Sequence, residues 1–171
     1  MPNDWKSKYD YIEPFHEGLA AVQRNDQWGF VDTTGKEVVP PKYDDVQSFN
    51  EGLAEVKLGD DETGKYGFVD TTGKEVVHLK YDFVWDFREG LARVKLNGKW
   101  GFVDTTGKEV VPPKYDNVEF FHGGLAKVNI GGVREDDLIE CYGGKWGFVD
   151  MRGNEYWDMT VDEACRQMKN R

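Results

Sequence analysis

The stretch Trp100–Asp116 reads WGFVDTTGKEVVPPKYD, and an identical string begins at Trp28. Close copies begin at Tyr66 and Trp146, so the motif occurs four times within 171 residues. Self-similarity at a period of roughly 20 to 50 residues is typical of repeat architectures. Aligned on a shared Tyr-Asp pair, the repeats begin at Tyr9, Tyr43, Tyr81 and Tyr115.

The first half of each repeat predicts a β-hairpin. In the first repeat, residues 18–24 alternate as a strand does, Asn25-Asp26 forms a two-residue turn, and residues 27–32 return. The third repeat has Asn97-Gly98 at this turn. Asn-Gly is a strong hairpin signal because both central residues of a type I′ turn need positive φ.

A second turn follows each hairpin. In residues 32–35 an Asp can bond nearby backbone N–H groups, and a Gly can adopt the left-handed conformation. Residues 37–39 are expected to form a third strand that ends at Pro40-Pro41, because proline donates no hydrogen bond to a ladder. The chain then crosses to the next repeat through residues 43–49. Each repeat is therefore predicted to be a three-stranded meander.

The apolar pattern predicts that these sheets stack. On the first strand two positions are apolar in every repeat, so we expect one face there to look inward and one outward. The position between them varies and is Ala21, Glu55, Arg93 or Lys127. The returning strand is apolar on both sides at Trp28, Phe30 and Val31, as expected for a sheet between two neighbours.

The predicted fold is all-β, with tandem β-hairpin or meander repeats stacked as an open array or solenoid. Stacking is required because a three-stranded meander of this size is barely stable alone. The alternative is a closed four-unit, propeller-like ring, in which the first strand completes the last sheet. Tyr9 and Tyr43 are 34 residues apart, whereas propeller blades usually take about 40 residues or more, which favours the open array.

We expect one repeat domain over residues 1–171, with a short helix over 160–170 that caps the last repeat. The approximate repeat bounds are 9–42, 43–80, 81–114 and 115–159. Thr160–Glu163 reads as a capping box, and basic residues near the end suit the helix dipole. Docking of this helix onto another protein is the alternative. The apolar positions at helical spacing are Val161, Ala164, Cys165 and Met168.

These residues resemble the bacterial WG-repeat, or KWG-repeat, proteins. The Lys-Trp-Gly signature stands at residues 99–101 and 145–147, and the likeness covers about residues 9–156. The resemblance implies tandem β-hairpin units that act as interaction or scaffolding modules, and it carries no catalytic residue across. The second repeat departs from the pattern at Tyr66, which replaces Trp, and at His78-Leu79, which replaces Pro-Pro.

The net charge of −10 argues against nucleic acid and against anionic membranes as partners. No run of about 18 apolar residues occurs, and the start of the chain lacks the apolar segment of a signal peptide. We therefore expect a cytoplasmic protein. In that reducing compartment Cys141 and Cys165 would be free thiols, and a disulfide between them is the alternative.

The recurring acidic residues at the second turn are candidates for calcium ligands. They are Asp32, Asp70, Asp104 and Asp150. Calcium needs about six to eight oxygens, and each turn supplies one Asp and two Thr or fewer, so turn capping is the expected role and no metal site is predicted. The same holds for Asp10, Asp44, Asp82 and Asp116, each of which follows the shared Tyr.

No catalytic constellation stands out. His16 and His122 align with Asn50 and Arg88, so this position accepts any polar residue. Nothing in the sequence places a histidine beside Cys141, and a lone thiol is a weak signal. The chain has no phosphate-binding glycine loop, no HExxH and no GxSxG. We therefore expect no catalytic residue and no cofactor.

Two acidic insertions at equivalent hairpin tips are the main candidate for a binding surface. They are residues 59–64 and 131–144. Insertions in a repeat array map to one face, often the binding face, and acidic loops complement a basic partner. The alternative is that they only increase solubility. The candidate residues are Asp60, Asp61, Glu62, Glu135, Asp136, Asp137, Leu138, Ile139 and Tyr142.

Trp85 is a further candidate because it lies outside the shared repeat pattern. Exposed aromatic side chains stack on peptides or sugars, although most such residues are partly buried packing. The sequence therefore predicts a non-enzymatic module that recognises a macromolecule, a protein of basic character. The alternative is a repeat protein that binds a small ligand or a carbohydrate through exposed aromatics.

Overall fold

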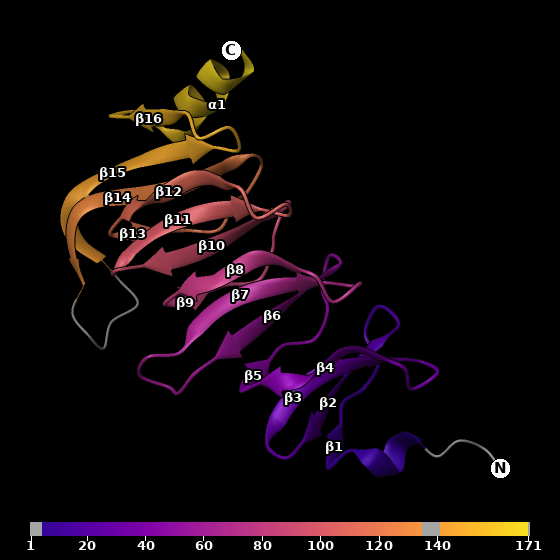
Figure 1. Cartoon of the computed structure of the whole chain (residues 1–171). Helices are drawn as coiled ribbons and strands as arrows, with labels where there is room; N and C mark the ends of the chain where they lie inside the picture. Colours follow the sequence, from indigo (N-terminus) through magenta and orange to yellow (C-terminus); the bar gives the residue numbers. More distant parts are fainter. Residues whose placement is uncertain (1–4, 135–140, 171) are drawn as a thin grey trace. The chain divides into compact units, whose positions relative to one another are not determined.

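The computed structural model describes residues 5–134 and 141–170 (Figure 1). The chain divides into two compact units, Met1–Asp86 and Phe87–Arg171. No helix in the described part of the chain is long and apolar enough to cross a membrane.

Short antiparallel strands make up the first unit. A 3-10 helix, η1 (Trp5–Lys8), precedes a sheet of β1 (Tyr11–Ile12), β2 (Leu19–Arg24), β3 (Gln27–Asp32) and β4 (Glu37–Tyr43). The second sheet contains β5 (Asp45–Val46), β6 (Leu53–Leu58), β7 (Lys65–Asp70) and β8 (Glu75–Tyr81). In both sheets the spatial order of the strands follows the chain order.

The same plan recurs in the rest of the chain. The third sheet contains β9 (Phe83–Val84), β10 (Leu91–Leu96), β11 (Lys99–Asp104) and β12 (Glu109–Tyr115). The fourth contains β13 (Asn117–Val118), β14 (Leu125–Arg134), β15 (Cys141–Asp150) and β16 (Glu155–Trp157), followed by α1 (Val161–Lys169). No described sheet closes on itself, and β1 does not join the fourth sheet. The predicted open tandem of all-β repeats with a C-terminal helix is confirmed in its strand pairing.

The third strand of the repeat is longer than predicted. β4 continues through Pro40 and Pro41, and Tyr43 pairs with Trp28. β4 is the last strand in its sheet, where a missing N–H need not interrupt a ladder, and the register shifts before Phe30 as at a bulge. The expectation that the proline pair ends the strand is therefore wrong.

The repeat also contains a strand that the sequence pattern did not indicate. Tyr11 and Ile12 pair with Gln23 and Val22, so each repeat is a four-stranded meander and not a three-stranded one. A two-residue strand is too short to show the alternation by which strands are recognised.

The predicted hairpin turns are confirmed by their backbone angles. Asn25 and Asp26 have φ values of 53° and 62°, and Asn97 and Gly98 have values of 51° and 77°. Both central residues are in the left-handed region, as a type I′ turn requires.

An apolar layer joins the two sheets within the first unit. Phe30, Val39 and Tyr43 of the first sheet are buried against Val46 and Phe49 of the second. The Phe30 and Phe49 rings meet edge to face with centroids 4.8 Å apart. In the second unit Phe102 and Phe121 repeat this contact at 4.7 Å. Because an isolated meander is marginal, this shared layer supplies most of the stability of each pair.

Turn glycines dock one sheet against the sheet before it. Gly73 follows β7, and a Cβ at this position would lie 2.5 Å from the Val38 carbonyl oxygen of the preceding sheet. Gly153 holds the same place in the second unit, where a Cβ would lie 2.7 Å from the Val110 carbonyl oxygen. Both glycines also have positive φ. Glycine is therefore required twice, by the turn and by the close approach of the sheets.

The variable position on the second strand of each sheet does not face open solvent. Ala21 is buried in the layer between the first two sheets, and Glu55, Arg93 and Lys127 are half-buried. In the second unit the Arg93 Nη1 donates a hydrogen bond to the Val118 carbonyl oxygen at 3.0 Å. The expectation of one outward face is wrong for Ala21, Glu55 and Arg93, because the next sheet of the unit covers Ala21 and Arg93, and Phe83 and Trp85 lie beside Glu55.

The C-terminal helix covers the last sheet. Its capping box is present, since Thr160 N donates to the Glu163 carboxylate at 2.7 Å. Ala164 is buried against Leu125 and Tyr156 together with the half-buried side chains of Cys165 and Met168. Cys165 is a free thiol. Val161 is 51% exposed, so its predicted place on the apolar side is wrong.

Candidate functional site

The aspartates of the second turn hold the backbone of that turn. The Asp32 Oδ1 accepts hydrogen bonds from Thr34 N at 2.8 Å, Thr34 Oγ1 at 2.6 Å and Lys36 N at 3.1 Å. The hydrogen bond from the Thr34 hydroxyl is the main cause that lowers the pKa of Asp32. Asp70, Asp104 and Asp150 accept equivalent bonds. The capping role predicted for these residues is therefore confirmed.

The aspartates after the shared Tyr cap the next hairpin tip. Asp10 accepts a hydrogen bond from Asn25 N at 2.8 Å, and Asp44 accepts one from Gly59 N at 2.7 Å. Asp116 accepts the equivalent bond from Gly131 N. Among the described residues, no group of three or more His, Cys, Asp or Glu side chains is placed to hold a metal ion.

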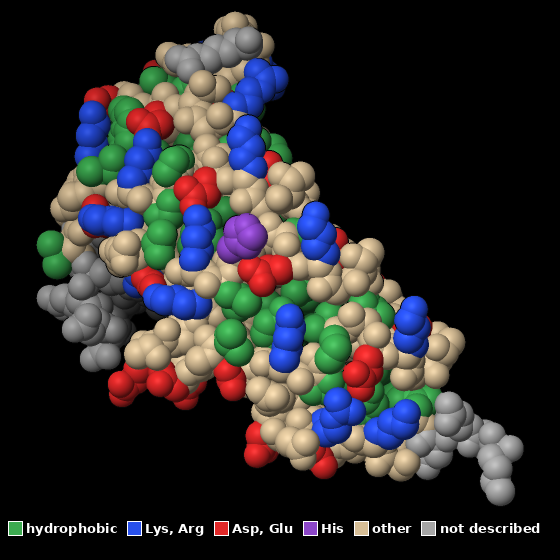
Figure 2. Space-filling model, viewed as in Figure 1, with side chains coloured by type: hydrophobic (Ala, Val, Ile, Leu, Met, Phe, Trp, Pro, Cys, Tyr) green, Lys and Arg blue, Asp and Glu red, His purple; other side chains and the backbone are tan. Residues whose placement is uncertain are grey.

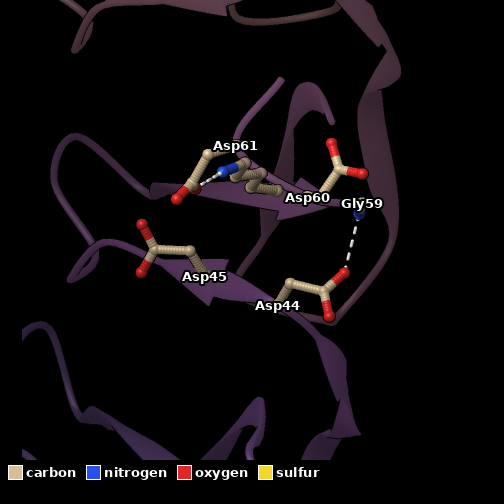
Figure 3. Close-up of a pocket in the computed structure, with 6 residues that line it drawn as sticks. Asp44, Asp45, Gly59, Asp60 and Asp61 are labelled. Carbon is tan, nitrogen blue, oxygen red and sulfur yellow. Dashed lines mark hydrogen bonds and ion pairs between the residues drawn. The ribbon is translucent and has the colours of Figure 1, made fainter. Parts of the chain in front are cut away.

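The acidic insertion of the second repeat joins β6 to β7 and borders a cavity of ≈ 490 Å³. Figure 3 shows Asp44 and Asp60 on either side of Gly59, with Asp45 and Asp61 on the other side of the cavity. The Asp60 Oδ1 accepts from Thr63 N at 2.7 Å, Thr63 Oγ1 at 2.8 Å and Glu62 N at 3.0 Å. One oxygen of Asp60 thus shapes the loop.

The next two acidic residues of this insertion are exposed. Asp61 is fully exposed and forms an ion pair of 2.6 Å with the Nζ of Lys57, which is buried. Glu62 is also exposed. Figure 2 shows acidic side chains gathered where the β6–β7 connection lies in Figure 1. One buried ammonium group therefore stands among several carboxylates.

The insertion of the fourth repeat differs from the predicted loop. β14 and β15 extend into it as a ladder that pairs Gly132 with Gly143, Val133 with Tyr142 and Arg134 with Cys141. The expectation that residues 131–144 form a loop throughout is therefore wrong. Tyr142 belongs to β15. The candidates Glu135, Asp136, Asp137, Leu138 and Ile139 lie outside the described residues.

Trp85 borders a second cavity in the first unit, of ≈ 320 Å³. Phe83 lies between Tyr66 and Trp85, with ring centroids 5.6 Å from Tyr66 and 5.5 Å from Trp85. Phe83 is 38% and Trp85 44% exposed. Asp45, Glu55 and Asp86 also line this cavity, and Asp45 lines the first cavity too. The two cavities therefore adjoin at Asp45.

Glu55 is electrostatically unusual. Burial raises the pKa of its carboxyl to about 7, with further contributions from the negative charges of Asp86 and Asp45. No described residue forms a hydrogen bond or an ion pair with this carboxyl group. A half-buried carboxyl without a donor or a cation is unfavourable unless it takes up a proton or meets a ligand.

The sequence indicated Asp60, Asp61 and Glu62 of the insertion. Of the residues that line the second cavity it indicated only Trp85. A signal was present, because Trp85 replaces a polar residue of the other repeats, such as Gln47, and Phe83 replaces the Asp45 of the second repeat, although the first repeat also has an aromatic residue, Tyr11, at that position. Glu55 stands at the variable position of the second strand. The stacking of sheets was needed to show that these departures converge.

A family described as "WG containing repeat" matches residues 6–28, 28–60, 66–100 and 100–133, which is well over half of the chain. The chain belongs to this family of WG-repeat proteins. No curated protein matches it. The crystal structure of the tricorn protease is similar at 18% identity and a TM-score of 0.43, over 90% of this chain and 17% of that chain. The similar region is therefore a small part of the tricorn protease chain.

Proposed function

We propose that this WG-repeat chain is a non-enzymatic interaction module that binds a basic segment of a partner protein at the acidic edge of the second repeat. The acidic edge comprises the two adjoining cavities and the β6–β7 connection. Its carboxylates are those of Asp44, Asp45, Glu55, Asp60, Asp61, Glu62 and Asp86.

The imbalance of charge at this edge carries the proposal. Lys57 is the one cation among the described residues that line the two cavities, and its ammonium group is already paired with Asp61. A surface with many carboxylates and one buried, paired cation attracts a partner of the opposite sign. Neighbouring aromatic side chains add contact area of the kind enriched at protein interfaces.

The test uses a labelled peptide of alternating lysine, arginine and glycine, with binding followed by fluorescence anisotropy. The double variant Asp61→Asn/Glu62→Gln keeps the loop-shaping carboxylate of Asp60. We expect it to bind roughly fivefold more weakly, because each exposed ion pair contributes up to about 1 kcal/mol. Added salt should weaken binding by the parent protein more than by the variant.

The matched control is Asp26→Asn/Glu51→Gln, which removes two charges from exposed turns outside the acidic edge. Its affinity for the peptide should equal that of the parent. If both double variants bound the peptide equally weakly, the loss of affinity would reflect net charge alone, and this result would contradict the proposal. Binding of a neutral oligosaccharide in place of the peptide would favour the carbohydrate alternative.

A further inference from the structure

Three aromatic side chains that differ from their counterparts in most other repeats meet at the second cavity. Tyr66 replaces the Trp of the other repeats, and Trp85 replaces a polar residue. Phe83 stands where the second and fourth repeats have Asp45 and Asn117 and the first repeat has Tyr11. The chain places all three on one wall, with successive ring centroids 5.5 to 5.6 Å apart. Their rings are inclined by 54° and 70°, so they form an angled wall and not a flat stack.

Three carboxylates accompany this aromatic wall. Glu55 comes from β6 and Asp45 from β5, and Asp86 follows β9. Asp45 uses one oxygen to accept a hydrogen bond from Val46 N at 2.9 Å. None of the three forms an ion pair with a described Lys or Arg side chain. The cavity thus combines ring faces with carboxylate acceptors that lack a cation.

We propose that this cavity binds the guanidinium group of an arginine side chain, and that this arginine belongs to the basic segment of the proposed function. The inference rests on that function for the source of the arginine. The aromatic and acidic side chains of the cavity are the reason for choosing a guanidinium group.

A guanidinium group can bind both to the aromatic wall and to the carboxylates of this cavity. It carries five N–H donors in a plane and pairs with carboxylates through two parallel hydrogen bonds. It also stacks on aromatic faces, and it is more weakly hydrated than an ammonium ion, so it enters a half-buried site more readily. A quaternary ammonium ion would contact the rings but has no donor for Glu55. The volume of ≈ 320 Å³ suits a side-chain head group.

The test is an NMR titration that follows the indole N–H of Trp85, which is identified by its loss in Trp85→Phe. The probes are N-acetyl-arginine methylamide, its lysine counterpart and choline. We expect saturable shifts with the arginine probe, weaker binding of the lysine probe and no binding of choline. Glu55→Gln should weaken binding of the arginine probe by about tenfold, because a hydrogen bond to a charged group is lost.

Glu51→Gln is the matched control, since it removes the same charge from an exposed turn outside the acidic edge. It should leave the affinity for the arginine probe unchanged, and circular dichroism should show that both variants fold. Equal binding of choline and arginine, or equal affinity of Glu55→Gln and the parent, would overturn the assignment.

The two proposals fail in different ways. If the arginine probe does not bind but the basic peptide still depends on Asp61 and Glu62, the cavity assignment is wrong and the proposed function stands. If the peptide does not bind either, the acidic edge is not an interaction surface for basic segments.

Discussion

Replacement of Glu55 by glutamine should stabilise the protein above neutral pH. Glu55 lies on β6 beside an aromatic wall and near Asp45 and Asp86, and no described cation is paired with it. Its ionised form is therefore disfavoured in the folded state, whereas in the unfolded chain water solvates it freely. Glutamine has nearly the same shape and cannot ionise.

The size of the effect follows from the pKa. Burial, followed by the charges of Asp86 and Asp45, raises the pKa of Glu55 from 4.5 to about 7. Each unit of pKa is worth about 1.4 kcal/mol, so a fully enclosed carboxylate would cost the folded state about 3 kcal/mol. Glu55 is only half-buried, and an unpaired amide also loses hydrogen bonds, so we expect a gain of about 1 to 2 kcal/mol.

The pH window of the effect is set by the two pKa values. Below 4.5 the carboxyl is protonated in both states, so it adds no penalty. Between 4.5 and about 7 the unfolded chain releases the proton while the folded state retains it, so the stability of the parent protein falls as pH rises. Urea unfolding of the parent and Glu55→Gln at about pH 4.5 and about pH 8 measures the difference.

Glu62→Gln serves as the control for stability, because Glu62 is exposed and its loss changes the net charge equally. The free energy of unfolding of Glu55→Gln relative to the parent should rise between the two pH values, and that of Glu62→Gln should not. A rise of the same size in both variants would refute the reasoning, since it would reflect net charge and not the burial of Glu55.

Two further predictions concern the stacked sheets. Phe68→Ala should lower the free energy of unfolding by about 3 to 5 kcal/mol, because this ring is 2% exposed. Phe15 is 41% exposed, so Phe15→Ala should lower it by about 1 kcal/mol or less. Equal melting temperatures for the two variants would contradict this prediction. Burial acts to raise the pKa of Glu155, but hydrogen bonds from Lys114, Tyr115 and Trp157 outweigh it and lower the pKa to about 2. The parent should therefore lose stability as pH falls from 4.5 towards 2, and Glu155→Gln should remove that part of an acid-unfolding curve.

The sequence predicted those parts of the fold that depend on local chemistry. The hairpin turn at Asn25-Asp26 and the capping box at Thr160 were predictable because each needs particular residue types at adjacent positions. The two-residue strand Tyr11–Ile12 and the extension of β4 through Pro40 were not, because pairing with a neighbouring strand decides both. An edge position tolerates a proline that the local rule excludes.

The sequence likewise predicted one part of the candidate site and not the other. The acidic insertion containing Asp60 and Asp61 was recognisable from its length and composition. The cavity containing Glu55 was not, because its residues are scattered over four strands and their neighbours. The sequence also suggested that the position of Glu55 faces solvent, and only the packing of sheet on sheet reverses that expectation.

The docking of Gly73 under Val38 and of Gly153 under Val110 restricts how such a chain can change in length. In each unit the carbonyl group and the glycine that leaves room for it belong to different repeats. A change in the spacing between the two repeats of a unit would therefore separate this glycine from the carbonyl group against which it packs. Insertion of a fraction of a repeat would place a side chain where only hydrogen fits.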